Sequence, residues 1–469
     1  MTIRSLLYSL FSFSLLSGAL SGAEPLTVSD YGAIGDGRHD DTEAVQKAVD
    51  AGGAVRFPAG RFRLTKSIQV ELQKTGLVSL IGSGATVVEM AGEGPAFRLL
   101  GTLKQNIAPA ELPDDFWTKA GNLLVTGINF VGIDPASEGL RVSHIVQLTV
   151  ANCSFRQFRH GIHFTEVNRN AIITGCHVYN NRDTGIYFDH VDFHQVNVVG
   201  SHISYNQGGG IVARGGALRN LQIGTCDIEA NVGPGMPPTA NVLIDSTGGS
   251  IGEVEITGCT LQHLPNTPGF ANIRCIGLST AVNFTPERRH GNLIVTGNMI
   301  NDADVNIHLD GVRGAVISGN TISLAASHDI LIENSSEIVL ADTVMDRHPR
   351  YRPDRTTHGG PVKQGIVIRN SDNCTLSTLR INGGKAPAEI DVSGGGHFQI
   401  SNCTIMNVEG IGLRLTDVRD SLVTANLLSA TTTGGAALVV KGGSGNLVNG
   451  NLVQGRSEVD PAGLLPATK

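Results

Sequence analysis

The chain has 469 residues, a formal net charge of −7 and an aromatic content of only 5%. This mild negative charge argues against nucleic acid as a partner, because nucleic-acid binding needs a basic stripe. Fifty-nine glycines and a single tryptophan suit many tight turns between short strands and disfavour a helical protein.

The first 23 residues have the pattern of an export signal. Arg4 supplies a positive charge, residues 6–16 form an uncharged apolar run, and Ser21-Gly22-Ala23 fits a small-x-small cleavage site. The run is too short to span a bilayer comfortably. We therefore expect residues 1–23 to be a signal peptide, and the mature protein to be secreted, extracellular or periplasmic, without a membrane span.

A capping helix is expected next. Residues 40–43 (Asp-Asp-Thr-Glu) offer an N-cap and acidic residues for a first turn. The helix should continue to about Ala51 with one apolar stripe, and Gly52-Gly53 should end it. Such a helix would cover the exposed edge of the strands that follow.

From about residue 146 to residue 453 the chain repeats one pattern. An apolar strand is followed by Gly or Asn, then by Cys or Asn, then by an apolar pair, and a GIxF-like strand follows some ten residues later. Uninterrupted repeats are 22 to 25 residues long, and the apolar residues alternate with polar ones, as in strands with one buried face. Three short strands per repeat must each pair with the same strand one turn along.

The pattern therefore predicts an all-β, right-handed parallel β-helix with three short strands per coil and an N-terminal capping helix. We expect one domain over residues 24–469, with a cap at 24–70 and regular coils at 123–455. The Cys/Asn column is interpreted as a buried ladder and not as a disulfide framework or a metal site, because the cysteines are odd in number and repeat at one position. This column comprises Cys153, Cys176, Ser201, Cys226, Cys259, Asn298, Asn320, Cys403, Asn426 and Asn451.

Residues 28–64 resemble the opening of the pectate-lyase-like superfamily, which includes rhamnogalacturonases and polygalacturonases. The resemblance rests on Tyr31-Gly32-Ala33, Gly35-Asp36-Gly37, Asp40-Asp41-Thr42 and Phe57-Pro58-Ala59-Gly60. It implies a right-handed β-helix that acts on, or binds, polysaccharide, without implying a particular reaction.

The catalytic motifs of the polygalacturonases do not carry over. Arg159-His160-Gly161, Asp183-Thr184-Gly185 and Gly208-Gly209-Gly210 occupy comparable places, and only the His-Gly of the first is similar. The paired aspartates of those hydrolases are missing, so a site has to be inferred from the outward side chains themselves.

Outward positions between residues 156 and 229 are rich in His, Tyr, Arg and Asp, and neighbouring coils should stack them into one patch. The catalytic candidates are His163, Tyr187 and Asp189, with Asp183, Asp227 and Glu229 as alternative acids or bases. The substrate-binding candidates are Arg156, His160, His177, Tyr179, His202, Arg214, Arg350 and Arg352.

Two chemistries stay open for this patch. A uronate lyase would use His163 or Asp189 as the base, Tyr187 as the acid, and Arg214 or Arg156 to neutralise the carboxylate. A glycoside hydrolase needs two carboxyl groups, which Asp227 and Glu229, with Asp183 or Asp189 opposite, would supply.

Each of these residues also has a structural alternative. Asp189 and Arg214 would make an ordinary ion pair, and the residues around 189–194 would form a hydrogen-bonded turn. No metal ligands are assigned, although Asp189, Asp192 and Asp227 would suit calcium.

Long loops are expected at 230–240, 262–271, 279–290 and 342–363. The last of these is rich in arginine, which suits the carboxylates of an acidic glycan; the alternative is a solvated basic loop. The sequence thus predicts a secreted carbohydrate-active β-helix that acts on a uronate-containing polysaccharide by lyase or glycoside hydrolase chemistry. The alternative is a non-catalytic glycan-binding or adhesion protein, and the oligomeric state stays open.

Overall fold

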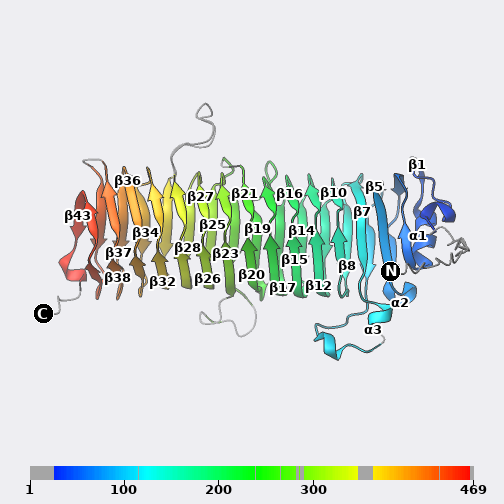
Figure 1. Ribbon diagram of the computed structural model, residues 1–469, viewed down its shortest axis with the longest axis horizontal. Helices are drawn as coiled ribbons and strands as arrows, with labels where there is room; N and C mark the ends of the chain where they lie inside the picture. The colour runs from blue at the N-terminus through cyan, green and yellow to red at the C-terminus, as the bar shows by residue number, and fades with distance from the viewer. Residues whose placement is uncertain are drawn as a thin grey trace, which may run out of the picture.

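The computed structural model describes residues 26–464, except 115, 238, 265, 281–284, 286–289, 347–362 and 432–433. Its strands stack into one elongated solenoid, along which the chain advances coil by coil from the N-terminal to the C-terminal end (Figure 1). Strands pair in parallel with their counterparts one coil before and one coil after. This arrangement confirms the predicted parallel β-helix.

The strands form three stacks that run the length of the solenoid. The first stack contains the GIxF strands, which pair in register, for example Ile162 with Ile186. Its strands are β4 (Ile68–Glu71), β6 (Gly94–Leu100), β8 (Ser137–Ser143), β11 (His160–Phe164), β14 (Thr184–Asp189), the start of β17 (Gly209–Gly224), β19 (Ala240–Gly249), β22 (Ala271–Ile276), β25 (Val305–Asp310), β28 (His328–Glu333), β31 (Gln364–Arg369), β34 (Ala388–Ser393), β37 (Ile411–Thr416), β40 (Ala436–Lys441) and β43 (Arg456–Val459).

The second stack follows the first in each coil. Its strands are β2 (Gly53–Arg56), the start of β5 (Val78–Met90), the start of β7 (Leu124–Gly132), β9 (Thr149–Ala151), β12 (Val167–Thr174), β15 (Asp192–Val199), the end of β17, β20 (Gly252–Thr257), β23 (Gly291–Thr296), β26 (Arg313–Ser318), β29 (Ser336–Ala341), β32 (Asp372–Ser377), β35 (Gln399–Ser401), β38 (Leu422–Thr424) and β41 (Leu447–Asn449).

The third stack consists mostly of three-residue strands and closes each coil. Its strands are β1 (Asp36–Asp40), β3 (Gly60–Leu64), the ends of β5 and β7, β10 (Ser154–Arg156), β13 (His177–Tyr179), β16 (His202–Ser204), β18 (Asp227–Glu229), β21 (Thr260–Gln262), β24 (Met299–Asn301), β27 (Thr321–Ser323), β30 (Val344–Asp346), β33 (Arg380–Asn382), β36 (Thr404–Val408), β39 (Leu427–Ala430) and β42 (Leu452–Gln454).

The corner between the second and third stacks explains the repeated Gly or Asn. Asn152, Gly175 and Gly200 turn this corner with φ angles of 52°, 60° and 54°. Only Gly, and to a lesser degree Asn, adopts this left-handed conformation readily. The next residue then points inward, which places the Cys/Asn column inside the coil.

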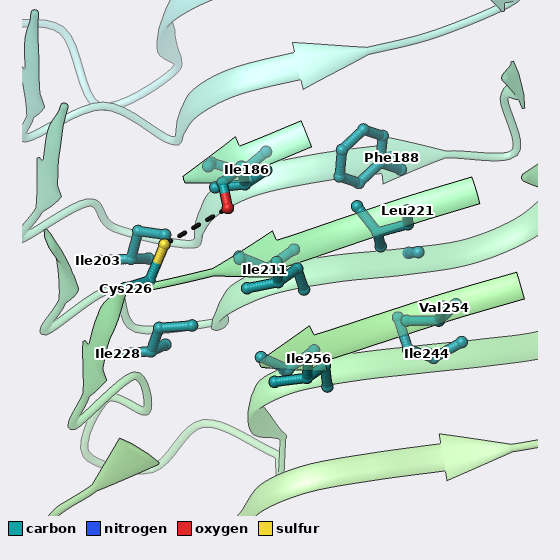
Figure 2. Close-up of a cluster of buried hydrophobic side chains, with 14 of the residues drawn as sticks. Ile186, Phe188, Ile203, Ile211, Leu221, Cys226, Ile228, Ile244, Val254 and Ile256 are labelled. Carbon is teal, nitrogen blue, oxygen red and sulfur yellow. Dashed lines mark hydrogen bonds between the residues drawn. The ribbon is translucent and has the colours of Figure 1, made fainter. Parts of the chain in front are cut away.

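All seven cysteines are buried and unpaired by disulfides, and Figure 2 shows Cys226 among buried isoleucines of neighbouring coils. Burial raises the pKa of the Cys153 thiol to about 12, so this thiol stays protonated. Farther along the same column, the amide of Asn298 donates to Oδ1 of Asn320 at 3.1 Å. These contacts confirm the predicted buried ladder of thiols and amides.

A second amide ladder lies at the corner between the third and first stacks and explains the glycine of the GIxF pattern. Asn181, Asn206 and Asn231 are fully buried and bond from one coil to the next through their side chains, at 2.7 and 2.8 Å. A Cβ atom at Gly185 would lie 2.8 Å from the side-chain amide nitrogen of Asn206 and 2.7 Å from the carbonyl oxygen of Gly210. The strand therefore needs a residue without a side chain at this position.

The N-terminal cap contains α1 (Thr42–Asp50), which buries Val45, Ala48 and Val49 as predicted. The carboxylate of Asp41, which the sequence suggested for the helix cap, instead accepts hydrogen bonds from the backbone nitrogens of Ile34, at 2.7 Å, and Gly35. Other short helices are a 3₁₀ turn at Val28–Tyr31, α2 (Leu72–Thr75), a 3₁₀ turn at Pro109–Glu111 and α3 (Phe116–Lys119). At the C-terminal end, β43 and a 3₁₀ turn at Pro461–Gly463 follow the last full coil.

Beyond residue 187 several outward positions of the first stack are apolar and buried, whereas Arg274 and His308 occupy the same register with polar, partly exposed side chains. An apolar cluster separate from the main core contains Val212, Leu243, Leu331 and Val367, and Tyr187 packs against this cluster.

Of the helices that the structure describes, none has the length and apolar character needed to cross a membrane.

Candidate functional site

Three outward side chains of the first stack form a column at its N-terminal half. Arg141 on β8, His163 on β11 and Tyr187 on β14 are register partners on successive coils. His160 is in turn the partner of Glu138. Residues far apart in the sequence thus meet because each coil repeats the register of the previous one.

Glu138 lies at the bottom of this site and is fully buried. Its carboxylate accepts two hydrogen bonds from Arg141, at 2.7 and 2.8 Å, and another from Arg159. Burial opposes its ionisation, but the hydrogen bonds and charges of His163 and Arg141 outweigh burial and hold the pKa of Glu138 well below its usual range. The site therefore has a permanent buried anion at its base.

His163 lies between two carboxylates. Its Nδ1 is 3.3 Å from Oε2 of Glu138, and its Nε2 is 3.3 Å from Oδ2 of Asp189. The ring of Tyr187 stacks on it at a centroid distance of 5.2 Å. His163 is only 5% exposed, so it is better placed to orient its neighbours than to reach a large substrate.

Asp189 joins the two residues that face outward. Oδ1 accepts a hydrogen bond from the hydroxyl of Tyr187 at 3.1 Å and lies 2.7 Å from Nδ1 of His190. Burial opposes ionisation, but the hydrogen bonds from His190, Tyr187 and His163 outweigh it and lower the pKa of Asp189. Burial and the charge of Asp189 raise the pKa of Tyr187 to about 12, so its hydroxyl stays protonated at neutral pH.

The imidazole of His190 is two-thirds exposed. A carboxylate next to Nδ1 fixes the tautomer with a proton on Nδ1 and leaves Nε2 free to accept one. His190 also lines a surface hollow of about 370 Å³ together with Lys104, His144, Glu166 and Asp192. The Asp189–His190 pair therefore holds a largely exposed imidazole at the edge of a concave surface.

His160 is buried beside His163 and Tyr187, with ring centroids 4.9 and 5.1 Å away. Burial and the neighbouring His163 lower the pKa of His160 to about 3, so its imidazole is neutral at neutral pH. Its Nδ1 has no hydrogen-bond partner among the residues that the structure describes.

Two further predicted residues border this group. Arg214 is exposed and is the register partner of Asp189 on the next coil. The carboxylate of Asp183 lies 3.9 Å from Nδ1 of His160 and accepts a hydrogen bond from the hydroxyl of Thr184. The structure thus brings His160, His163, Tyr187, Asp189, Asp183 and Arg214 together.

The other predicted residues that the structure describes form a separate group on the third stack. His202 lies 2.9 Å from Asp227, and His263 lies 3.1 Å from Glu229. Burial and the charge of Glu229 raise the pKa of Asp227. Register partners on the same strands are Arg156 with Tyr179, and His177 with His202.

The three aspartates considered for calcium do not share a site. Asp189 belongs to the first stack, Asp227 pairs with His202 on the third, and Asp192 accepts a hydrogen bond from Asn106. Arg350 and Arg352 lie outside the described residues.

The candidate residues inferred from the sequence do not include Glu138, Arg141, Arg159 or His190, although Arg159 lies in the 159–161 motif and His190 in the expected turn at 189–194. The first two belong to a coil that precedes the recognisable repeat, although SEGLRVS at 137–143 could have been aligned with the GIxF strands. His190 follows the strand directly, in the corner, where alternation no longer gives the direction of a side chain.

Comparison with known proteins gives two family matches. Residues 117–261 and 356–459 match the model of the right-handed β-helix region, which thus covers more than half of the chain. Residues 26–106 match the model described as rhamnogalacturonase A/epimerase, pectate lyase-like.

Individual relatives match only short segments. Mannuronan C5-epimerase AlgE3 of Azotobacter vinelandii is 37% identical over 73 residues, which are 13% of this chain and 4% of the relative. Plasmin and fibronectin-binding protein A of Streptococcus pneumoniae is 53% identical over 49 residues, which are 9% of this chain and 7% of the relative. The chain therefore spans a small part of these relatives.

One solved structure illustrates the shared fold. The pre-mature gene product 12 of bacteriophage phi29 superimposes with a TM-score of 0.52 at 14% identity, over 90% of this chain and 57% of that chain.

Proposed function

The chain belongs to the right-handed parallel β-helix family, with a pectate-lyase-like N-terminal segment, and from this premise we propose that it acts on a uronate-containing polysaccharide. The proposed reaction begins with removal of the proton α to the uronate carboxylate, as in a lyase or a C5-epimerase. We further propose that the protein is exported, because a polymeric glycan is met outside the cell.

The observation that carries the proposal is the shared carboxylate of Asp189. It bonds both a protonated tyrosine hydroxyl and a largely exposed histidine. Proton removal from a sugar ring needs a base and an acid in one place, and these two groups supply both.

The steps follow from these positions. Nε2 of His190 takes the proton from C5 of the uronate, and the electron pair moves towards the carboxylate, whose charge Arg214 and Lys104 offset. In a lyase, the C4–O bond then breaks, a C4=C5 double bond forms, and the hydroxyl of Tyr187 protonates the departing oxygen. In an epimerase, the C4–O bond stays intact and the hydroxyl of Tyr187 instead gives its proton to C5 from the opposite side of the ring.

His163 is a positioning residue in this proposal. It supports the ring of Tyr187 and donates towards Asp189 while Glu138 holds it from the other side. This assignment changes the role of His163 from the base that the sequence suggested to a group that orients the acid.

A second candidate is a glycoside hydrolase on the third stack. Asp227 and Glu229 point to the same side of one strand, and the raised pKa of Asp227 suits a carboxylic acid that donates a proton. This reaction would produce reducing ends without unsaturated uronates.

The test is incubation with polymannuronate, polygalacturonate and a neutral glucan, followed by absorbance of unsaturated uronates, reducing ends and C5 configuration. We expect a uronate polymer to be cleaved with a new double bond, or epimerised, and we expect His190→Ala and Tyr187→Phe each to lower this turnover by about 10²–10⁴-fold. His39→Ala and Tyr31→Phe, both in the N-terminal cap, serve as controls and should keep full turnover.

Three results would overturn the proposal. Reducing ends without unsaturation would favour the hydrolase. Binding of a glycan without any chemical change would favour a glycan-binding protein or adhesin. Unchanged turnover in both His190→Ala and Tyr187→Phe would remove the proposed residues from the reaction.

A further inference from the structure

The base of the candidate site combines three metal-ligating groups. Glu138, His160 and His163 each offer a donor atom, and these atoms lie within 4.8 Å of one another. All three side chains are buried, at 0%, 5% and 5% exposure. Within the part of the chain that the structure describes, no other set of three such groups meets this spacing.

His160 supplies an independent observation. Its Nδ1 is buried and has no hydrogen-bond partner in the described part of the chain; the carboxylate oxygen of Asp183 is 3.9 Å away, too far for a hydrogen bond. Leaving a buried polar atom unpaired has a free-energy cost, because the hydrogen bonds that it made to water are not replaced. A ligand that accepts the lone pair of this nitrogen would remove that cost.

The surrounding contacts resemble those that orient metal ligands. The Nδ1 of His163 faces Glu138, while its Nε2 faces the carboxylate of Asp189. A histidine that binds a metal with one nitrogen commonly donates the other to a carboxylate, and a ligating carboxylate is itself hydrogen-bonded. The carboxylate of Glu138 accepts such hydrogen bonds from Arg141 and Arg159.

The local charge has to accommodate a cation beside two guanidinium groups. Glu138, Asp183 and Asp189 are the acidic groups in contact with the two histidines. These three carboxylates offset the positive charges of Arg141 and Arg159, so electrostatic repulsion does not prevent a divalent cation from binding here.

We propose that Glu138, His160 and His163 bind one divalent transition-metal ion. Two imidazoles and one carboxylate are an established ligand set for zinc with one coordination position left open, whereas calcium prefers six to eight oxygen ligands. This proposal does not rest on the proposed reaction, because it concerns binding by the free protein.

Zinc uptake by the full chain, first stripped with a chelator and without glycan, tests the proposal. Isothermal titration should show one Zn²⁺ per chain at micromolar or lower Kd. His160→Ala and His163→Ala should weaken binding at least a hundredfold, while His39→Ala, which removes an exposed histidine, should not change it. Circular dichroism of each variant establishes that it is folded.

X-ray absorption at the zinc edge of the wild-type protein gives an answer that needs no variant. We expect scattering from two imidazoles and a first shell near 2.0–2.1 Å, the usual zinc–nitrogen distance. Absence of zinc uptake by the folded wild type, a first shell without imidazole, or unchanged uptake by His160→Ala would each overturn the proposal.

Discussion

Replacing Asn206 by alanine tests the amide ladder that holds the first stack in register. Its side chain accepts hydrogen bonds from the backbone nitrogen and the Nδ2 of Asn181, at 3.2 and 2.7 Å. It donates to the carbonyl of Val178 at 3.0 Å and to Oδ1 of Asn231 at 2.8 Å. At a net value of about 1 kcal/mol for each bond, the four bonds correspond to about 4 kcal/mol.

The assay is urea unfolding followed by circular dichroism, with hydrogen exchange at the amide of Asn181. We expect Asn206→Ala to lower the free energy of unfolding by about 4 kcal/mol and to accelerate exchange at that amide, which loses its acceptor. Asn449→Ala is the control, because Asn449 is exposed and accepts one side-chain hydrogen bond, and its cost should be below about 0.5 kcal/mol. Equal effects of the two substitutions, or unchanged exchange at Asn181, would refute the reasoning.

Three further predictions concern the same region. Tyr187→Phe should lower turnover on the substrate by about 10²–10⁴-fold while leaving thermal stability within about 1 kcal/mol, because only the hydroxyl bonded to Asp189 is lost. Glu138→Gln, measured in chelator, should cost about 2 kcal/mol at neutral pH, since its arginine partners stay partly in water. Because folding lowers the pKa of Glu138, this difference should shrink as the pH falls below the ordinary value of 4.5, and constancy down to pH 3 would contradict the assignment. In thermal unfolding, Gly185→Ala should destabilise the protein by about 1–3 kcal/mol, because its new Cβ atom collides with neighbouring atoms. Gly434→Ala should be neutral in the same assay, because a Cβ atom there has no neighbour within 4 Å.

The fold follows from the sequence because a solenoid repeats one register. Alternation in GIHF and GIYF predicts that Ile162 and Ile186 point inward and that His163 and Tyr187 are neighbours, and the structure has both. The inward Cys/Asn column follows in the same way from the left-handed residue that precedes it.

The candidate site was only partly predictable. Alternation indicates that a side chain leaves the core, but not whether it is then covered: His163 points outward and is still buried. Alternation also does not show which outward residues share a surface. The sequence therefore suggests one patch for Asp189 and Asp227, although they belong to different stacks. His190 lies in a corner, where backbone conformation and not alternation sets the direction of the side chain.

Proton NMR of a uronate polymer in D₂O tests the central claim most directly. The proposed reaction removes the C5 proton, so the wild-type protein should produce deuterium at C5 with altered configuration, or a 4,5-unsaturated end, and His190→Ala should produce neither. A polymer that binds but keeps its C5 proton and its chain length would contradict the account.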